Sequence, residues 1–158
     1  MSAASTPFDP FDFSHWKARE ARRVELAAQI LPRNKAIVFD ALEAAKIALV
    51  NVIFDGGGDS GQIESVSATS ADNIAMELPD VEIDIELTEW VGDGVRFMHT
   101  SLSDAIEELC YAFLSEEHAG WENNEGAFGE FAFSVADRTV ALDHNVRISD
   151  TAYYAHEW

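Results

Sequence analysis

Basic residues are scarce after Lys46. Residues 47–158 contain three bases, Arg96, Arg138 and Arg147, against 23 acidic residues, so this part sums to −20 and the whole chain to −19. Such an imbalance repels nucleic acids and membranes, and it attracts basic surfaces or cations. We therefore expect no direct binding to nucleic acid or to a membrane, and we expect a basic protein surface as the partner.

The chain also lacks a second cysteine, a long apolar run and a signal peptide. Cys110 stands alone and cannot form an internal disulfide, which fits the reducing cytoplasm. No apolar run reaches the roughly 18 to 20 residues that cross a bilayer. Residues 1–12 have neither the basic patch nor the apolar core of a secretory signal. These absences predict a cytoplasmic protein.

The apolar content is nevertheless sufficient for a packed core. Hydrophobic residues make up 47% of the chain, including ten Phe and four Trp, which argues against intrinsic disorder. A length of 158 residues favours one domain. Residues 1–13 have two prolines and no periodicity. We expect a flexible arm at 1–13 and a single domain at 14–158.

Helical periodicity predicts two helices in the N-terminal part, at 15–31 and 34–49. Pro32 is expected to end the first helix, and Asn34 is expected to cap the second. A loop this short favours a helical hairpin. A further helix is expected from Ser101 or Ser103 to about residue 117.

Strand periodicity predicts the remaining elements, and the clearest strand alternates apolar and acidic residues at 81–87. The other expected strands lie at 50–54, 62–69, 128–135 and 139–145. In the hairpin formed by the last two, Phe131, Phe133 and Val135 are expected to point inward. The order ααβββαββ defines an α+β fold with a mostly antiparallel sheet of about five strands.

Two groups of acids are candidate partner-binding residues. Alternate residues on a strand lie about 6.6 to 6.8 Å apart, so Glu82, Asp84 and Glu86 form a carboxylate row that a DNA-binding surface could recognise. The expected helix adds Asp104, Glu107, Glu108, Glu116 and Glu117. The alternative is an ordinary solvated face, but such faces normally mix both signs of charge.

The glycine-rich turn at 55–59 is a weaker candidate for a cation site, with Asp55, Asp59 and Glu64 around it. The EF-hand loop requires Gly at position 6 and Glu at position 12. Counted from Asp55, these positions hold Ser60 and Val66. We therefore expect no bound metal or other cofactor, with a weak cation site as the alternative.

The five histidines show no HxxxH or HExxH pairing, so no zinc signature is present. His118 follows two glutamates and His144 follows Asp143, and each could join an acid in an acid–base pair if the fold brought them together. The alternatives are a histidine favoured near a helix C-terminus for His118 and a strand-end residue for His144.

Three segments carry a family resemblance: residues 54–64 (FDGGGDSGQIE), 118–130 (HAGWENNEGAFGE) and 140–145 (VALDHN). They resemble a family of small acidic, uncharacterised bacterial proteins that are often encoded on plasmids and other mobile elements. The resemblance covers about residues 34–158. It implies the α+β fold and a mobile-element setting, and it transfers no catalytic residue because none is assigned in the family.

The resemblance also suggests that the turn at 55–64 and the loop at 118–130 form one surface. The residues expected to converge there are Asp59, Gln62, Trp121, Glu122, Asn123 and Asn124. An exposed Trp among Asn and acids suits a binding site. The alternative is a Trp that covers the end of the sheet.

These patterns favour a non-enzymatic acidic interaction protein that engages a basic protein surface. Its most specific version is a DNA mimic that inhibits a nucleic-acid-binding defence system, such as a restriction or CRISPR effector. The second interpretation is a small enzyme or accessory domain that uses Asp59, Glu64, Trp121 and Asn123 with a divalent cation. A third interpretation is a soluble acidic domain whose charge serves only to keep it in solution. The basic segment 17–23 could pair with the acidic part, internally or in a homodimer.

Overall fold

The computed structural model describes residues 14–58, 60–88, 94–123, 125–149 and 151–158. The predicted arm at 1–13 and the candidate residues Asp59 and Asn124 lie outside the described residues. The elements in chain order are α1 (Ser14–Ala44), β1 (Leu49–Gly57), β2 (Ser60–Thr69), β3 (Ala75–Met76), β4 (Glu82–Thr88), β5 (Val95–Ser101), α2 (Leu102–Glu117), β6 (Ala127–Ser134) and β7 (Thr139–Val146).

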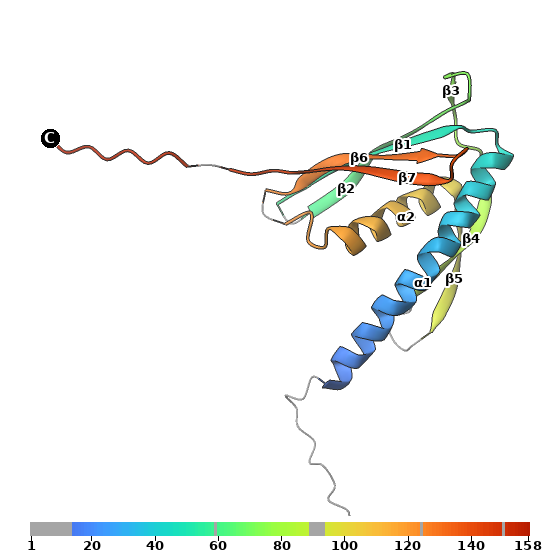
Figure 1. Ribbon diagram of the computed structural model, residues 1–158, viewed down its shortest axis with the longest axis horizontal. Coiled ribbons are helices and arrows are strands. Elements are labelled where there is room, and N and C mark those ends of the chain that lie inside the picture. Colours follow the sequence, from blue (N-terminus) through green and yellow to red (C-terminus); the bar gives the residue numbers. More distant parts are fainter. Residues whose placement is uncertain (1–13, 59, 89–93, 124, 150) are drawn as a thin grey trace, which may run out of the picture.

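The main sheet has five strands in the order β3-β2-β1-β6-β7, and every neighbouring pair is antiparallel. Both helices lie on the same side of this sheet, and a two-stranded ribbon of β4 and β5 lies beside α1 (Figure 1). The predicted α+β class, with a five-stranded antiparallel sheet, is therefore confirmed. No helix in the described part of the chain is long and apolar enough to cross a membrane.

The N-terminal helical hairpin is a wrong prediction, because α1 runs without interruption through Pro32. Proline removes the N–H that would bond the carbonyl of Ala28, and its ring crowds that carbonyl. Both residues are exposed, so water can take the place of the missing donor. The Asn34 side chain does not cap a helix. Its amide donates to the Glu86 carbonyl and its oxygen accepts from the Glu86 N–H, both at 2.9 Å.

The true end of α1 is a left-handed cap at Lys46, before the end predicted for the second helix. Lys46 has φ 61°, the Ile47 N–H donates to the Leu42 carbonyl, and the Lys46 N–H donates to the Glu43 carbonyl. This pair of bonds is the Schellman pattern. It turns the chain directly from α1 into β1.

The strand predicted at 81–87 exists as β4, but it does not join the main sheet. It pairs with β5, which the sequence pattern did not reveal because Phe97 is 71% exposed and β5 lacks apolar alternation. In the main sheet the two-residue strand β3 takes the edge next to β2 instead.

The core lies between the sheet and the two helices. Phe54 of β1, together with Phe131 and Phe133 of β6, is fully buried, and Val135 is buried beside them, so the predicted inward positions are confirmed. The Ser101 hydroxyl caps α2 by accepting from the Asp104 N–H at 3.1 Å, as predicted. The helix residues that fill the core are Val38, Phe39 and Leu42 of α1 and Leu102, Ala105, Ile106, Leu109, Cys110 and Leu114 of α2.

Candidate functional site

The carboxylate row of β4 begins with two exposed acids that share one histidine. His99 of β5 lies directly across from Asp84, and its two ring nitrogens lie 2.7 Å from an Asp84 oxygen and 2.6 Å from a Glu82 oxygen. The hydrogen bonds that the protonated ring donates to Asp84 and then to Glu82 raise the pKa of His99 above its ordinary value. Protonated His99 therefore offsets part of the negative charge of this row.

The third acid of the row points toward the protein. The Glu86 side chain is only 12% exposed, and its carboxylate lies 3.1 Å from the Arg33 Nε of α1. The backbone of Glu86 is bonded on both sides to Asn34. Each of the three acids of β4 therefore has a partner within the chain, and only Glu82 and Asp84 are open to a partner protein.

The acidic face of α2 is different. Asp104, Glu107 and Glu108 lie on one turn, on the side of the helix opposite the buried Ile106 and Leu109. Burial, and then repulsion by Asp104 and Glu108, raises the pKa of Glu107. None of these three forms an ion pair with any residue that the structure describes.

Two further acids, Glu116 and Glu117, occupy the last turn of α2. Both are exposed, this turn contains no basic residue, and neither carboxylate has an ion-pair partner in the described ranges. Negative charge at a helix C-terminus is opposed by the helix dipole, at a cost of about 0.3 to 1 kcal/mol each. We use the name α2 face for the five acids of this helix: Asp104, Glu107 and Glu108 on one side, and Glu116 and Glu117, which lie on other sides of the helix, in its last turn.

The loop after α2 contacts β1 and β2 close to the turn that joins them. Trp121 lies over Gly56 and Gly61, which are cross-strand partners. A Cβ atom would come within 2.4 Å of the indole at Gly56 and within 2.3 Å at Gly61, so glycine is needed at both positions. The indole also meets the buried Phe54 ring edge-on at 5.4 Å. Trp121 is therefore a half-buried cover over the end of the sheet, which is the alternative considered above.

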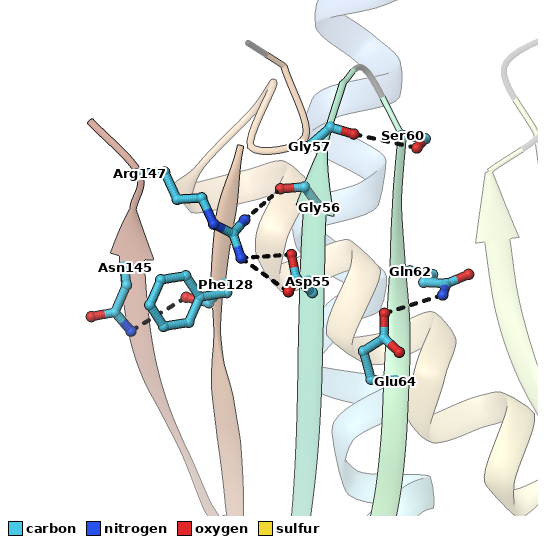
Figure 2. Close-up of polar contacts among 9 residues, drawn as sticks. All are labelled: Asp55, Gly56, Gly57, Ser60, Gln62, Glu64, Phe128, Asn145 and Arg147. Carbon is cyan, nitrogen blue, oxygen red and sulfur yellow. Dashed lines mark hydrogen bonds and ion pairs between the residues drawn. The ribbon is translucent and has the colours of Figure 1, made fainter. Parts of the chain in front are cut away.

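The other residues of the expected surface are divided between two hollows. Gln62 and Glu64 line a shallow hollow of about 290 Å³ beside β2, where the Gln62 amide donates to the Glu64 carboxylate at 3.1 Å (Figure 2). Trp121 and Asn123 line a separate pocket on the side of β7. Glu122 is partly buried and lines neither. Within the described ranges, no three His, Cys, Asp or Glu side chains are grouped so that they could hold a metal ion.

The pocket beside β7 has a volume of about 470 Å³ and contains a histidine pair that sequence reasoning did not place together. The rings of His118 and His144 are parallel to within 2°, with centroids 3.6 Å apart. His144 also stacks on Phe54 at 5.8 Å, and its Nδ1 is buried and has no hydrogen-bond partner among the described residues. Burial, and then the charge of His118, lowers the pKa of His144. His144 is therefore neutral at neutral pH.

Arg147 closes the pocket at the end of β7. Its guanidinium donates to the Asp55 carboxylate at 2.9 Å and to the Gly56 carbonyl at 3.0 Å, and it lies over the Phe128 ring at 4.8 Å (Figure 2). The charge of Arg147 is thus paired within the sheet. The fold also requires Gly126 here, because its φ is +80° and a Cβ atom would lie 1.7 Å from the Gly56 carbonyl oxygen.

The described residues define an acidic α+β protein, in which the acids of α2 have no cation partner and a pocket beside β7 has an aromatic wall. Residues 30–158 match the model of a family of unknown function, DUF6878, and the chain belongs to this family. Neither a curated protein nor a solved structure was found to be similar to it. The matched region includes the α2 face and all the residues that line the pocket.

Proposed function

We propose that this protein is a non-enzymatic binding protein that engages a basic surface of another protein through the α2 face. The observation that carries the proposal is that the five acids of this face have no cation partner among the described residues. The exposed acids of β4, by contrast, already share His99.

Asp104 lies in the first turn of α2, where the helix dipole favours it, but the stability of the fold does not account for the other four acids. Like charges three or four residues apart on a helix destabilise it, and Asp104, Glu107 and Glu108 are such a set. The helix dipole opposes Glu116 and Glu117. A basic partner would relieve both costs, because its cations would neutralise the acids. The field of a chain with net charge −19 would also speed the encounter with such a partner.

The most specific version of the proposal is inhibition of a nucleic-acid-binding protein. Side chains three or four residues apart on a helix have Cβ atoms about 5 to 6 Å apart, so the α2 face presents several carboxylates at close intervals. Such a surface can occupy a groove that normally receives phosphates. The mobile-element setting implied by the sequence resemblance fits an inhibitor of a restriction or CRISPR effector.

The test is affinity capture with the full chain, followed by purification of the captured protein and titration at two salt concentrations. We expect a partner with a basic surface, whose affinity for this chain falls steeply between about 50 mM and 200 mM salt. A DNA fragment that the partner binds should compete with this chain. Capture that does not depend on salt, or a partner without a basic surface, would contradict the proposal.

A gel-shift titration is the control that distinguishes a protein that imitates DNA from one that binds DNA. In a gel-shift titration at low salt, where electrostatic affinity is greatest, the chain alone should not retard DNA. Tight binding there would show that the chain itself contacts nucleic acid, and the proposal would be wrong.

A further inference from the structure

A series of aromatic rings leads from the core to the pocket beside β7. Phe54 is fully buried, His144 stacks on it, and His118 stacks on His144. His118 and His144 both line the pocket, together with Trp121. Because His144 is held between its contacts with Phe54 and His118, the pocket has a fixed aromatic wall and needs no rearrangement to receive a flat group.

The charge of the pocket favours a cation. Arg147 is paired with Asp55, and the lowered pKa of His144 keeps that imidazole neutral. Glu125 is exposed and lines the pocket, and in the described part of the chain its carboxylate has no ion-pair or hydrogen-bond partner. Apart from His118, the unpaired charged group of the lining is therefore Glu125, within a chain whose net charge is −19 with histidines counted as neutral.

The aromatic wall favours one class of cation. A guanidinium group is planar and weakly hydrated, and it stacks on aromatic faces, whereas an ammonium group is compact and strongly hydrated. A volume of about 470 Å³ lies within the roughly 300 to 1,000 Å³ that is typical of ligand sites. It is ample for one arginine side chain.

We propose that the pocket lined by His118, Trp121 and Glu125 binds the guanidinium group of an arginine side chain supplied by a basic partner protein. This proposal rests on the proposed function, because it assumes such a partner. Continuity supports it. His118 is the C-cap of α2, so the pocket directly follows Glu116 and Glu117 on the α2 face. A basic segment that lies along α2 would bring an arginine to the pocket.

An anion is the competing ligand, because Arg147 also lines the pocket. The guanidinium of Arg147, however, already donates to the Asp55 carboxylate and to the Gly56 carbonyl. The overall negative charge would also repel an anion. A carboxylate or phosphate ligand is therefore disfavoured, and inorganic phosphate is included in the test as the competing ligand.

The test is an NMR titration of the full ¹⁵N-labelled chain with the tripeptide acetyl-Gly-Arg-Gly-amide. We expect saturable shifts of the Trp121 indole N–H and of the His118 and His144 ring signals. The lysine analogue should bind several-fold more weakly, while the neutral citrulline analogue and inorganic phosphate should cause no such shifts. Absence of shifts with the arginine peptide, equal shifts with citrulline, or shifts with phosphate would each overturn the proposal.

Two substitutions test the assignment of residues. Glu125→Gln removes the unpaired charge and should weaken arginine-peptide binding about fivefold, as expected for a solvent-accessible charged hydrogen bond of about 1 kcal/mol. His118→Leu replaces the flat imidazole ring with an aliphatic side chain, and it should also weaken binding. Glu122→Gln is the matched control, because it removes an acid from the same loop outside the pocket. An equal loss in Glu122→Gln would assign binding to the general field and overturn the proposal.

These outcomes separate this proposal from the proposed function. If a basic partner is captured, but Glu125→Gln and His118→Leu leave its affinity unchanged, the arginine pocket is wrong and the proposed function stands. If the arginine peptide shifts the pocket signals but no basic partner is captured, the pocket stands as an arginine site and the proposed function is wrong.

Discussion

The acidic row of β4 and the acidic face of α2 contain the same residue types, yet they differ in what surrounds them. On β4, His99 binds Glu82 and Asp84, and Arg33 reaches Glu86. On α2, no acid has a cation partner within the part of the chain that the structure describes. The density of acids along a sequence therefore does not measure the charge available to a partner.

The two regions also differ in what their charge does for the fold. The partners of the β4 acids come from other elements, so these acids hold β4 against β5 and α1. On α2, burial and then repulsion by Asp104 and Glu108 raise the pKa of Glu107. The β4 acids stabilise the structure through their partners, whereas the α2 acids have no cation partner among the described residues and are, in our proposal, the ones that meet a basic protein.

The largest effect should be on the rate of association with the basic partner. Neutralising the α2 face by Asp104→Asn with Gln at its four glutamates should slow association about tenfold or more at low salt, because the charges that steer the encounter are removed. Glu82→Gln with Asp84→Asn should slow it less than about threefold, because His99 already offsets part of that charge. Stopped-flow measurements at two salt concentrations give the association rates of both variants and of the unmodified chain. Equal losses would mean that both regions face the partner.

A measurement of stability tests the ion pair between Arg33 and Glu86 of β4. Arg33→Ala leaves the largely buried Glu86 carboxylate without its cation and should lower the free energy of unfolding by about 1 kcal/mol. In a Glu86→Gln background, Arg33→Ala should lower the free energy of unfolding by less, because no buried carboxylate is left without its cation. Arg19→Ala, at an exposed position, is the control and should stay within about 0.5 kcal/mol. Denaturant titration measures all of these, and identical costs in both backgrounds would disprove the pairing.

The titration of His99 tests the shared charge on the β4–β5 ribbon. Its pKa should lie above about 6.5, because Asp84 and Glu82 bind the protonated ring. The stabilisation that it contributes is fully present below about pH 6.5, and it is lost as the pH rises through the raised pKa. Glu82→Gln with Asp84→Asn should bring the NMR titration midpoint of His99 down, whereas Glu86→Gln should leave it unchanged. An unshifted midpoint in the double variant would contradict the geometry.

The smallest effect concerns the repulsion within α2. Glu107→Gln should raise the free energy of unfolding by a few tenths of a kcal/mol at neutral pH, because burial and two neighbouring acids disfavour the charged form of Glu107. The gain should vanish below about pH 4, where the carboxyl is protonated in the folded and the unfolded chain alike. Glu77→Gln, an exposed site outside α2, serves as the control in the same denaturant series. A loss of stability in Glu107→Gln at neutral pH would mean that this carboxylate has a stabilising partner.

Sequence patterns predicted those parts of the fold that depend on local signals. The cap at Ser101, the periodicity of α2 and the inward positions of β6 are set by residues close together in the chain, and all three are confirmed. The hairpin at Pro32 was wrong because the backbone of β4 satisfies the side chain of Asn34, and β4 is distant in sequence.

The candidate sites follow the same division. The helix expected to end at about residue 117 already carried Asp104, Glu107 and Glu108, and the structure places these three on one side of α2, away from the core. Neither the neutralisation of the β4 row nor the stacking of His118 on His144 leaves a signal in sequence spacing. In both cases the partner is brought into contact by tertiary packing alone.

The burial of Cys110 makes its reaction with a thiol reagent a measure of local unfolding. Its side chain is fully buried on the core face of α2, and burial raises the pKa of its thiol far above the ordinary range. Only the thiolate reacts with disulfide reagents, so modification must wait until α2 separates from the sheet. Because the chain has a single cysteine, the labelling rate reports this one event. The labelling rate of Cys110 therefore measures how often α2 unfolds locally.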